Sequence, residues 1–321
     1  MSKLYAGVDL GGTSMIAVIA DRRGKILGSS DCATIREVNA SETIDQIAEQ
    51  IVLAAKEADI KPSKIESIGV GAPGAVSPEE GIVVRAPNLG WSDVPLSALL
   101  GKRLKKKVVL GNDVQVAILG EHAFGVASGF NRVVGIWVGT GIGGGLIING
   151  KLDRGARGAA GEIGHMVLKE DGPVCGCGRT GCVEALASRT SMERDVRAAT
   201  VKGKKSAVLQ IMKERNKTRM TSSVMNRALK AGDPIMLDVL ANAQHYLGLL
   251  AGNVVNLIDP EMVVIGGGVA QRLGEDFVGP IRELARSRFL RPDPEGRIRI
   301  EHSILGDYSG ALGAASLAQN I

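Results

Sequence analysis

The residues with the most specific chemistry are three cysteines and a histidine that stand close together. Cys175, Cys177 and Cys182 fall within eight residues, and His165 precedes the first of them by ten positions. Three thiolates and one imidazole complete the tetrahedral shell of a structural zinc ion, whereas a catalytic zinc keeps an open position. The spacing therefore predicts a structural Zn²⁺ site. The alternatives are a knuckle that only staples a loop, or a reduced thiol cluster.

Two carboxylates flank this cluster and suggest a purpose for it. Glu162 precedes His165 by three residues, and Glu184 follows Cys182 by two. A metal that fixes the backbone between two acids would hold both carboxylates in place. We therefore expect a rigid loop that presents Glu162 and Glu184 to a bound molecule.

Three glycine-rich runs have the composition of phosphate-binding loops, because glycine lets backbone N–H groups approach an anion and threonine adds a hydroxyl donor. The runs are Asp9 with Gly11, Gly12 and Thr13; Gly139, Thr140 and Gly141; and Gly266, Gly267 and Gly268. The second run also matches the dinucleotide fingerprint, which should open a helix. Residues 146–150 are instead typical of a strand and a hairpin turn. The runs predict a nucleotide site, with a plain turn as the alternative for the third.

Two acids near the ends of predicted strands are candidates for catalysis. Asp113 follows a short apolar strand, and a carboxylate there can cap a helix or accept a proton from an attacking hydroxyl. Asp9 stands beside the first glycine run and can hold Mg²⁺ through water. Phosphoryl transfer needs mainly positioning and charge stabilisation, so these groups together indicate that class of reaction.

The chain is predicted to consist of two related halves. Residues 5–27 and 134–152 each contain a strand, a glycine-rich turn, a second strand, a tight turn and a third strand. The further elements that we expect are a helix near 44–55, strands at 67–71 and 108–110, a helix after 113, helices between 184 and 257, a strand at 262–265, a helix near 275–288, a strand at 297–302 and a helix from 309. This order predicts an α/β fold of two similar domains with a central cleft. The expected domains are residues 1–118 joined by a C-terminal helix at 309–321, and residues 119–308.

Composition excludes several other classes of protein. A hydrophobic content of 45% with 23% charged residues is ordinary for a globular chain, and no segment has the length of a membrane span. The basic residues between 194 and 219 are expected to form a solvated helical face. Aromatic residues make up only 3%, which argues against a stacking platform for nucleic acid. The cysteine spacing favours a reducing compartment, so we expect a cytoplasmic protein without nucleic-acid or membrane partners.

In these motifs the chain resembles kinases of the ROK family, in the sugar kinase, Hsp70 and actin superfamily. The matching segments are 9–13, 71–74, 87–91, 112–113, 139–145, 162–165 and the cysteine cluster up to Glu184. They extend over nearly the whole chain. The resemblance implies two similar domains of the actin-like/ribonuclease H-like ATPase type that close on a sugar and a nucleotide.

The resemblance also implies roles for individual residues. Asp113 would be the general base for the sugar 6-hydroxyl, and Mg²⁺ would accompany ATP. The expected sugar-binding residues are Gly74, Asn88, Asn112, Asp113, Glu162, His165 and Glu184. His165 would use one ring nitrogen for zinc and the other for the sugar, since the two nitrogens are chemically distinct.

The activity that we expect from the resemblance is ATP-dependent phosphorylation of glucose at its 6-hydroxyl, a step of glycolysis, by a homodimer or homotetramer. The alternatives are an N-acetylmannosamine or N-acetylglucosamine kinase, a fructokinase or allokinase, a glucokinase that uses polyphosphate, and a non-catalytic sugar-sensing protein. Three positions depart from the common pattern of relatives, namely Ser14, Gly111 and Gln115. Ser14 replaces a frequent lysine next to the first glycine run and leaves the phosphoryl donor open.

Overall fold

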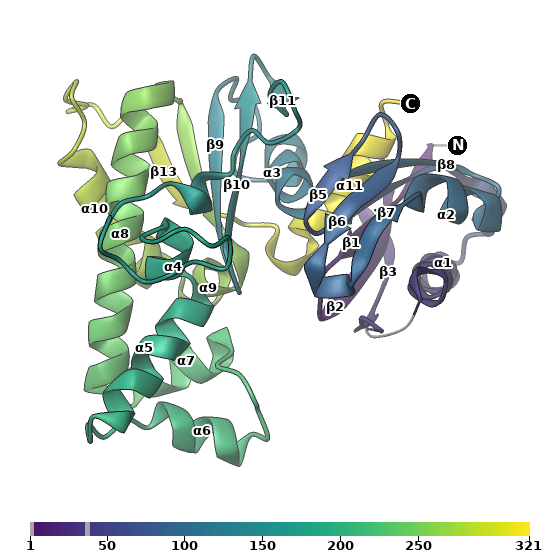
Figure 1. The fold of residues 1–321 in the computed structure, drawn as a ribbon. Coiled ribbons are helices and arrows are strands. Elements are labelled where there is room, and N and C mark those ends of the chain that lie inside the picture. The colour runs from purple at the N-terminus through teal and green to yellow at the C-terminus, as the bar shows by residue number, and fades with distance from the viewer. Residues whose placement is uncertain (1–2, 36–38) are drawn as a thin grey trace. The chain divides into compact units, whose positions relative to one another are not determined.

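The computed structural model describes residues 3–35 and 39–321, which fall into two compact units (Figure 1). Unit 1 comprises residues 1–131, 145–160 and 304–321, and unit 2 comprises residues 132–144 and 161–303. The C-terminal segment therefore packs with the N-terminal part of the chain. The domain boundary at residue 118 stays a prediction.

Unit 1 is built on a five-stranded sheet with the order β3-β2-β1-β4-β8. Its strands are β1 (Leu4–Leu10), β2 (Ser14–Asp21), β3 (Ile26–Ala33), β4 (Ile65–Ala72) and β8 (Lys107–Asn112). β1, β2 and β3 form an antiparallel meander, whereas β1 pairs with β4 and β4 with β8 in parallel. Parallel pairs need crossover connections, so helices pack on the faces of such a sheet.

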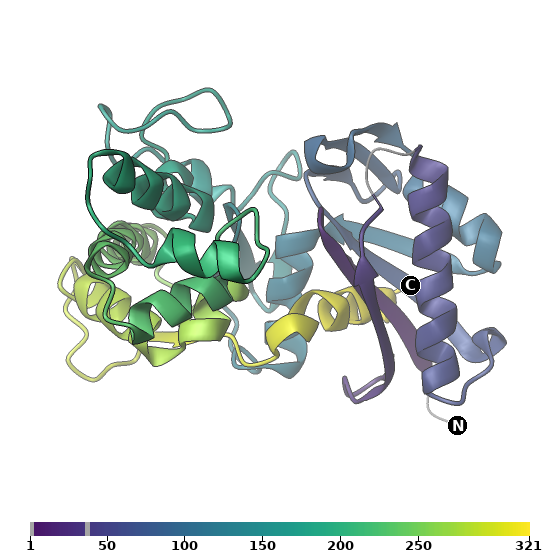
Figure 2. The same cartoon turned by 90° about the horizontal axis from the view of Figure 1, so that it is seen from below.

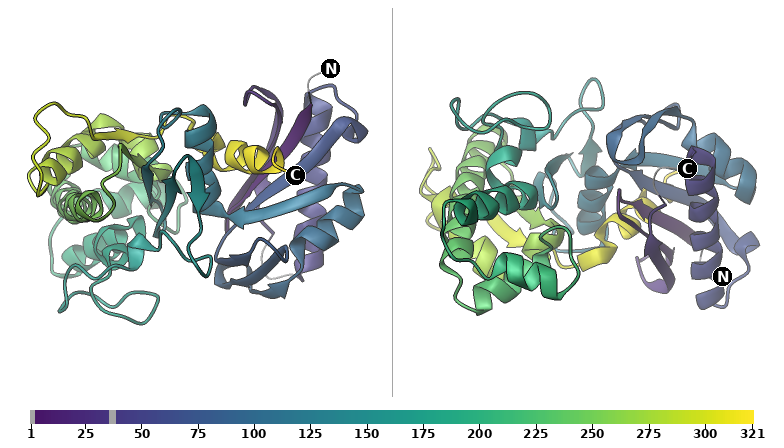
Figure 3. Two further views of the ribbon diagram at one scale, coloured as in Figure 1. Left: turned by 90° about the horizontal axis from the view of Figure 1, so that it is seen from above. Right: turned by 60° about the horizontal axis from the view of Figure 1, so that its bottom comes forward.

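Alternate residues of β1 face different helices. Ala6, Val8 and Leu10 pack in one cluster with α1 (Ala40–Glu57), while Tyr5 packs in another with α11 (Ser309–Ala318). Because side chains alternate across a strand, α1 and α11 cover opposite faces of the sheet, as Figure 2 shows. Gly7 lets α11 come close, since an ideal Cβ on it would lie 1.9 Å from a carbonyl oxygen of that helix. α3 (Asp113–Phe124) packs along α11 (Figure 3).

A smaller sheet in unit 1 was not predicted from the sequence. Its strands are β5 (Ala75–Ser77), β6 (Ile82–Ala86) and β7 (Trp91–Val94), paired antiparallel. A 3-10 turn at Pro87–Leu89, which ends at Gly90 with a φ of 67°, joins β6 to β7. A proline and a glycine with positive φ interrupt the alternation of apolar residues here, so the sequence pattern predicts a loop instead of strands. Unit 1 also contains the 3-10 turn Pro62–Lys64 and α2 (Leu96–Leu104).

The second sheet repeats the plan of the first, with the order β11-β10-β9-β12-β13. Its strands are β9 (Val133–Val138), β10 (Ile142–Ile148), β11 (Lys151–Asp153), β12 (Met262–Gly266) and β13 (Arg299–His302). β12 pairs in parallel with β9 and β13, and β11 pairs antiparallel with β10. Asn149 and Gly150 have φ values of 54° and 70°, as a tight hairpin turn requires, which confirms the predicted turn.

Helices make up about half of unit 2. They are α4 (Val183–Ala187), α5 (Arg189–Val201), α6 (Val208–Glu214), α7 (Ser222–Lys230), α8 (Pro234–Ile258), α9 (Gly267–Leu273) and α10 (Glu275–Arg286). The side chains of Ser188, Thr221 and Asp233 accept hydrogen bonds from backbone N–H groups in the first turns of α5, α7 and α8, which fixes where these helices begin. In the described ranges, no helix is both long and apolar enough to cross a membrane.

Candidate functional site

Unit 1 brings three carboxylates together at the end of β1. Asp9 is half-buried beside the first turn of α11, because an ideal Cβ on Gly310 would lie 2.4 Å from Asp9 Oδ2. Loss of hydration, and then repulsion by Asp113 and by Asp307, raises the pKa of Asp9 to about 7. A divalent cation would offset this repulsion, so the residues present fit the expected Mg²⁺ beside Asp9. Asp307, in the 3-10 turn Gly306–Tyr308, was not among the predicted site residues.

Asn112 and Asp113 stand where β8 passes into α3. Asn112 caps this helix, since its Oδ1 accepts hydrogen bonds from the N–H groups of Val114 and Gln115 at 3.0 and 3.1 Å. Its amide nitrogen donates to the carbonyl oxygen of Gly74 at 3.1 Å, which ties two of the predicted sugar-binding positions together. Asp113 is the first helical residue, and its Oδ1 accepts from Val114 N–H at 2.9 Å. The capping role that the sequence allowed for Asp113 thus belongs mainly to Asn112.

The first glycine run forms the turn between β1 and β2. Thr34 on the neighbouring segment braces it, since the Thr34 hydroxyl donates to the Gly11 carbonyl oxygen at 2.8 Å and its N–H donates to the Thr13 carbonyl oxygen at 3.0 Å. Gly12 lies against Asn88, because an ideal Cβ on Gly12 would be 2.9 Å from the Asn88 Cβ. A predicted phosphate-loop residue and a predicted sugar residue are therefore neighbours in unit 1.

The four predicted metal ligands converge in unit 2. One ligand atom from each of His165, Cys175, Cys177 and Cys182 lies within 4.8 Å of all the others. The distance from Cys175 Sγ to His165 Nδ1 is 3.7 Å, and so is the distance between the sulfurs of Cys177 and Cys182. Sulfur atoms around a tetrahedral zinc with bonds of about 2.3 Å are separated by about 3.8 Å. The donor set and its spacing therefore fit one tetrahedral ion.

The charges within this cluster also favour a cation. Burial raises the pKa of the Cys175 thiol to about 12, whereas hydrogen bonds from Arg179 lower the pKa of Cys177 to about 6. The thiolate is the form that binds a metal. The protein groups alone favour the thiolate form only at Cys177. A bound cation would stabilise the thiolate form of all three cysteines together.

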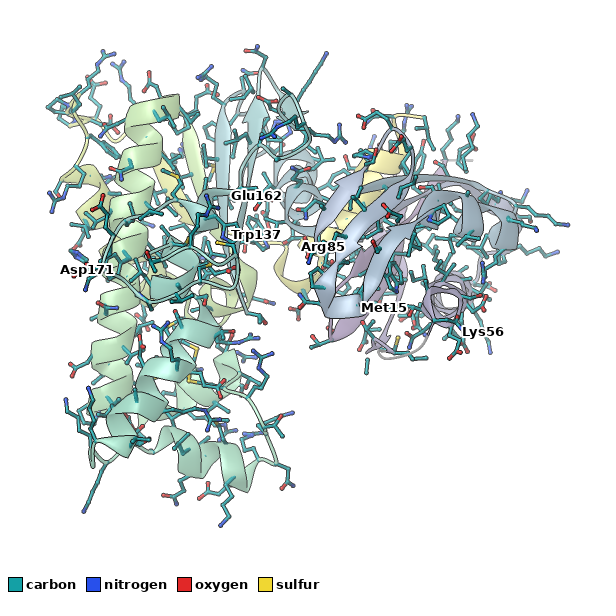
Figure 4. The ribbon with its side chains drawn as sticks, in the orientation of Figure 1. Met15, Lys56, Arg85, Trp137, Glu162 and Asp171 are labelled. Atoms are coloured by element: carbon teal, nitrogen blue, oxygen red, sulfur yellow. The ribbon has the colours of Figure 1, made fainter. Side chains whose placement is uncertain are left out.

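The two predicted carboxylates border the metal cluster on different sides. His165 turns Nδ1 toward Cys175 and Nε2 toward Glu162, whose Oε2 is 4.0 Å away. The Glu162 side chain is 64% exposed, and Figure 4 labels it in unit 2. Glu184 is half-buried at the start of α4, with Oε1 3.5 Å from Cys175 Sγ and Oε2 accepting from Ile142 N–H at 3.0 Å. Glu184 thus connects the metal cluster to the turn that follows β9.

The second and third glycine runs lie side by side in unit 2. Gly139, Thr140 and Gly141 form the tight turn between β9 and β10, which confirms that this run does not open a helix. Gly266 ends β12, and an ideal Cβ on Gly267 would lie 2.6 Å from the carbonyl oxygen of Val138, next to the turn. Gly268 is the second residue of α9.

Besides Asp307, two residues that organise these regions were not predicted from the sequence. Glu121 of α3 is fully buried and receives hydrogen bonds from Ile304 N–H, Leu305 N–H and the Ser309 hydroxyl, so it fixes the approach to α11. Arg189, which begins α5, donates from Nη2 to Thr140 Oγ1 at 2.8 Å. The signal for Glu121 would have been a charge within an apolar helical stretch, whereas Arg189 carried no local signal.

Comparison with known proteins gives consistent similarities over nearly the full length. The model of the ROK family matches residues 5–321. The chain is 36% identical over 312 residues to the glucokinase of Thermotoga maritima, covering 97% of this chain and 96% of that protein. Its structure is similar to a ROK family glucokinase from Streptomyces griseus in complex with glucose and AMPPNP, with a TM-score of 0.86, 32% identity and coverage of 99% and 100%. A ROK hexokinase from Thermus thermophilus gives a TM-score of 0.79 at 32% identity, with coverage of 99% and 98%.

These similarities confirm the predicted fold class, an α/β protein of two similar domains of the actin-like ATPase type. The two five-stranded sheets have the same plan. In each, three strands that are consecutive in the sequence form a meander, and two later strands extend the sheet in parallel.

Proposed function

Because the chain belongs to the ROK family, we propose that it is an ATP-dependent glucokinase, which transfers the γ-phosphoryl group of ATP to the 6-hydroxyl of glucose. It is a phosphotransferase with an alcohol group as acceptor and acts in carbohydrate metabolism, at the entry to glycolysis. The observation that carries the proposal is the position of Asp113, at the end of β8 and close enough to Asp9 to perturb it.

In this proposal Asp113 is the general base. Its carboxylate accepts the proton of the glucose 6-hydroxyl as that oxygen bonds to the γ-phosphorus. The bond from the γ-phosphorus to its bridging oxygen breaks, and ADP leaves. Asp9 would hold the Mg²⁺ ion, which when bound would neutralise charge on the phosphates. The first and second glycine runs supply backbone donors to the phosphates, and Gly266–Gly268 contact the nucleotide.

The residues that we propose for sugar binding are those that the family resemblance implies, namely Gly74, Asn88, Asn112, Asp113, Glu162, His165 and Glu184. The carboxylates accept hydrogen bonds from ring hydroxyls, and an acceptor left unpaired by the wrong sugar costs about 1–3 kcal/mol. We propose that zinc occupies the Cys₃His cluster as a structural ion. It would orient His165 and, through Cys175, Glu184.

Two further properties remain part of the proposal. A cytoplasmic location is supported by the three free thiols of the cluster, since disulfides form in oxidising compartments. A homodimer or homotetramer is expected, and light scattering of the purified protein would measure the assembly.

The test is a coupled measurement of ADP release with glucose, mannose, fructose, N-acetylglucosamine and N-acetylmannosamine. Glucose should give the highest kcat/KM, and its product should be a substrate for a dehydrogenase specific for glucose 6-phosphate. A tenfold advantage for an N-acetyl sugar, about 1.4 kcal/mol in transition-state binding, would make the protein an N-acetylhexosamine kinase instead. No hexose-dependent ADP release would support the sugar-sensing alternative.

The matched variant is Asp113→Asn. It should lose about 10²–10⁴-fold in kcat or more, because the amide keeps the size of the side chain and cannot accept the proton. Glucose should still bind, as followed by tryptophan fluorescence. Activity within threefold of the wild type would remove Asp113 from the role of base.

A further inference from the structure

Two arginines lie beside the Gly139–Gly141 turn and are linked to it by hydrogen bonds. Arg189 Nη2 donates to Thr140 Oγ1 at 2.8 Å. Arg219, in the segment before α7, donates from Nη2 to Thr190 Oγ1 at 3.4 Å, and this hydroxyl donates to the Thr140 carbonyl oxygen at 2.7 Å. Both guanidinium groups are therefore held next to a turn that the sequence predicts to bind phosphate.

The positive charge of this pair is poorly compensated by the protein. Among the residues that the structure describes, neither guanidinium group has a carboxylate oxygen within 4.0 Å. The neighbouring acid, Glu193, already pairs with Arg197 at 2.7 Å and accepts from Met220 N–H at 2.8 Å. Burial, and then repulsion by Arg219, lowers the pKa of Arg189. Two cations held close together, with Arg189 partly buried, favour an anionic partner.

A buried hydroxyl without a partner borders the same space. Ser222 is only 9% exposed, and its Oγ makes no hydrogen bond to any residue that the structure describes. An ideal Cβ on Gly268 would lie 3.4 Å from this oxygen and 4.0 Å from Arg189 Nη1. Gly268 thus leaves open the space that Ser222 and Arg189 both face. Buried hydroxyls nearly always find a partner, so the orphaned Oγ points to a ligand.

We propose that Arg189, Arg219 and Ser222 form an oxyanion site that binds a phosphate group of the phosphoryl donor. Guanidinium groups bind phosphate oxygens through paired, charge-assisted hydrogen bonds, and the Ser222 hydroxyl adds a donor. The identity of the ligand as a phosphoryl donor rests on the proposed function. The phosphate group can belong to a nucleotide or to an inorganic polyphosphate chain, and binding measurements separate these two sources.

The test measures binding without sugar or turnover. ADP, tripolyphosphate and inorganic phosphate are titrated by calorimetry into the zinc-loaded protein and its Arg189→Gln, Arg219→Gln and Ser222→Ala variants. Arg189→Gln should weaken binding of the preferred ligand about tenfold or more, the loss typical of a hydrogen bond to a charged group. Lys217→Gln removes an exposed charge from the same segment and should change the dissociation constant less than twofold.

Ser222→Ala separates a ligand contact from a structural role. Because the hydroxyl lacks a protein partner, its removal should leave the Tm of the unliganded protein unchanged or higher, while binding weakens severalfold. A lower Tm with unchanged binding would contradict the proposal. If Arg189→Gln does not fold, the exposed Arg219 gives the same test without disturbing a buried position.

The outcomes distinguish this inference from the proposed function. Preference for ADP over tripolyphosphate assigns the site to a nucleotide phosphate, and the reverse assigns it to a polyphosphate chain. Failure of the wild type to bind any of the three ligands, or unchanged binding in both arginine variants, overturns the inference. If the wild type phosphorylates no hexose but its binding still depends on Arg189, the proposed function fails and the oxyanion site stands.

Discussion

Asp9→Asn should make the unliganded protein more stable while removing its activity. The folded environment raises the pKa of Asp9 from an ordinary 3.8 to about 7, so the carboxylate form is disfavoured by folding. This difference corresponds to about 4 kcal/mol as an upper limit. Asp9 is only half-buried, and the first turn of α11 near Gly310 favours the anion. We therefore expect the variant to gain about 1–3 kcal/mol in the free energy of unfolding at pH 8.

The sign of the pH dependence follows from proton binding. Between about pH 4 and pH 7 the folded wild type holds a proton on Asp9 that the unfolded chain releases, so this group's contribution to stability falls as pH rises through that window. The variant has no such proton. The difference in the free energy of unfolding between the variant and the wild type should therefore be small at pH 5, increase up to about pH 7 and then stay constant.

Urea denaturation of both proteins at pH 5, 6, 7 and 8, without nucleotide or added Mg²⁺, measures this difference. Asp59→Asn is the control, because Asp59 is exposed in unit 1 with a φ of 53° that asparagine also tolerates. The control should show no pH-dependent gain. A raised pKa of Asp9 is refuted if Asp9→Asn is less stable than the wild type at pH 8, or if the difference in stability between the two proteins is the same at every pH.

Three other changes test separate parts of the structure. Cys177→Ser should lower the zinc content and weaken glucose binding, as measured by metal analysis and sugar titration. Cys32→Ser, which lies outside the cluster, should keep one zinc per chain. Normal glucose binding by a zinc-free variant would show that zinc binding and glucose binding are not coupled. Gly12→Val should raise the KM for ATP about tenfold or more. It should also weaken glucose binding, because a Cβ at this position meets Asn88. An unchanged KM for ATP would count against a phosphate loop at Gly12. Glu121→Gln should cost about 2–4 kcal/mol in the free energy of unfolding, because the amide nitrogen that replaces one carboxylate oxygen would face either the N–H of Val126 or the three donors on Oε1. A cost below about 0.5 kcal/mol in denaturant unfolding would show that this anchor is unimportant.

Local patterns in the sequence predicted the repeated strand–turn–strand units, the helix after Asp113 and the grouping of His165 with three cysteines. Each of these depends on residues close in the chain, such as Asn149 with Gly150 or Cys175 with Cys177. His165 could be predicted as a fourth ligand because it, too, lies close to the cysteines in the sequence.

The contacts that define the environment of Asp9 were not predictable in the same way. Asp307 and Gly310 reach Asp9 from the other end of the chain, and only the fold brings them together. The placement of Arg189 next to Thr140 likewise depends on how α5 begins after the metal cluster. The sheet of residues 75–94 was missed because its strands are short and Pro87 and Gly90 interrupt them.

The return of α11 to unit 1 has a consequence for how the protein is made. The strands of the first sheet and α3 leave the ribosome early, but the helix that covers one face of this sheet comes about 180 residues later. At about 5–20 residues per second, α11 follows α3 after roughly 10–40 s, and until then Tyr5 and Gly7 of β1 lack their partner. During synthesis this half of the molecule exposes an apolar sheet face. Chains that terminate before Ile304 would be left with that face uncovered and with Asp9 lacking its neighbours Asp307 and Gly310.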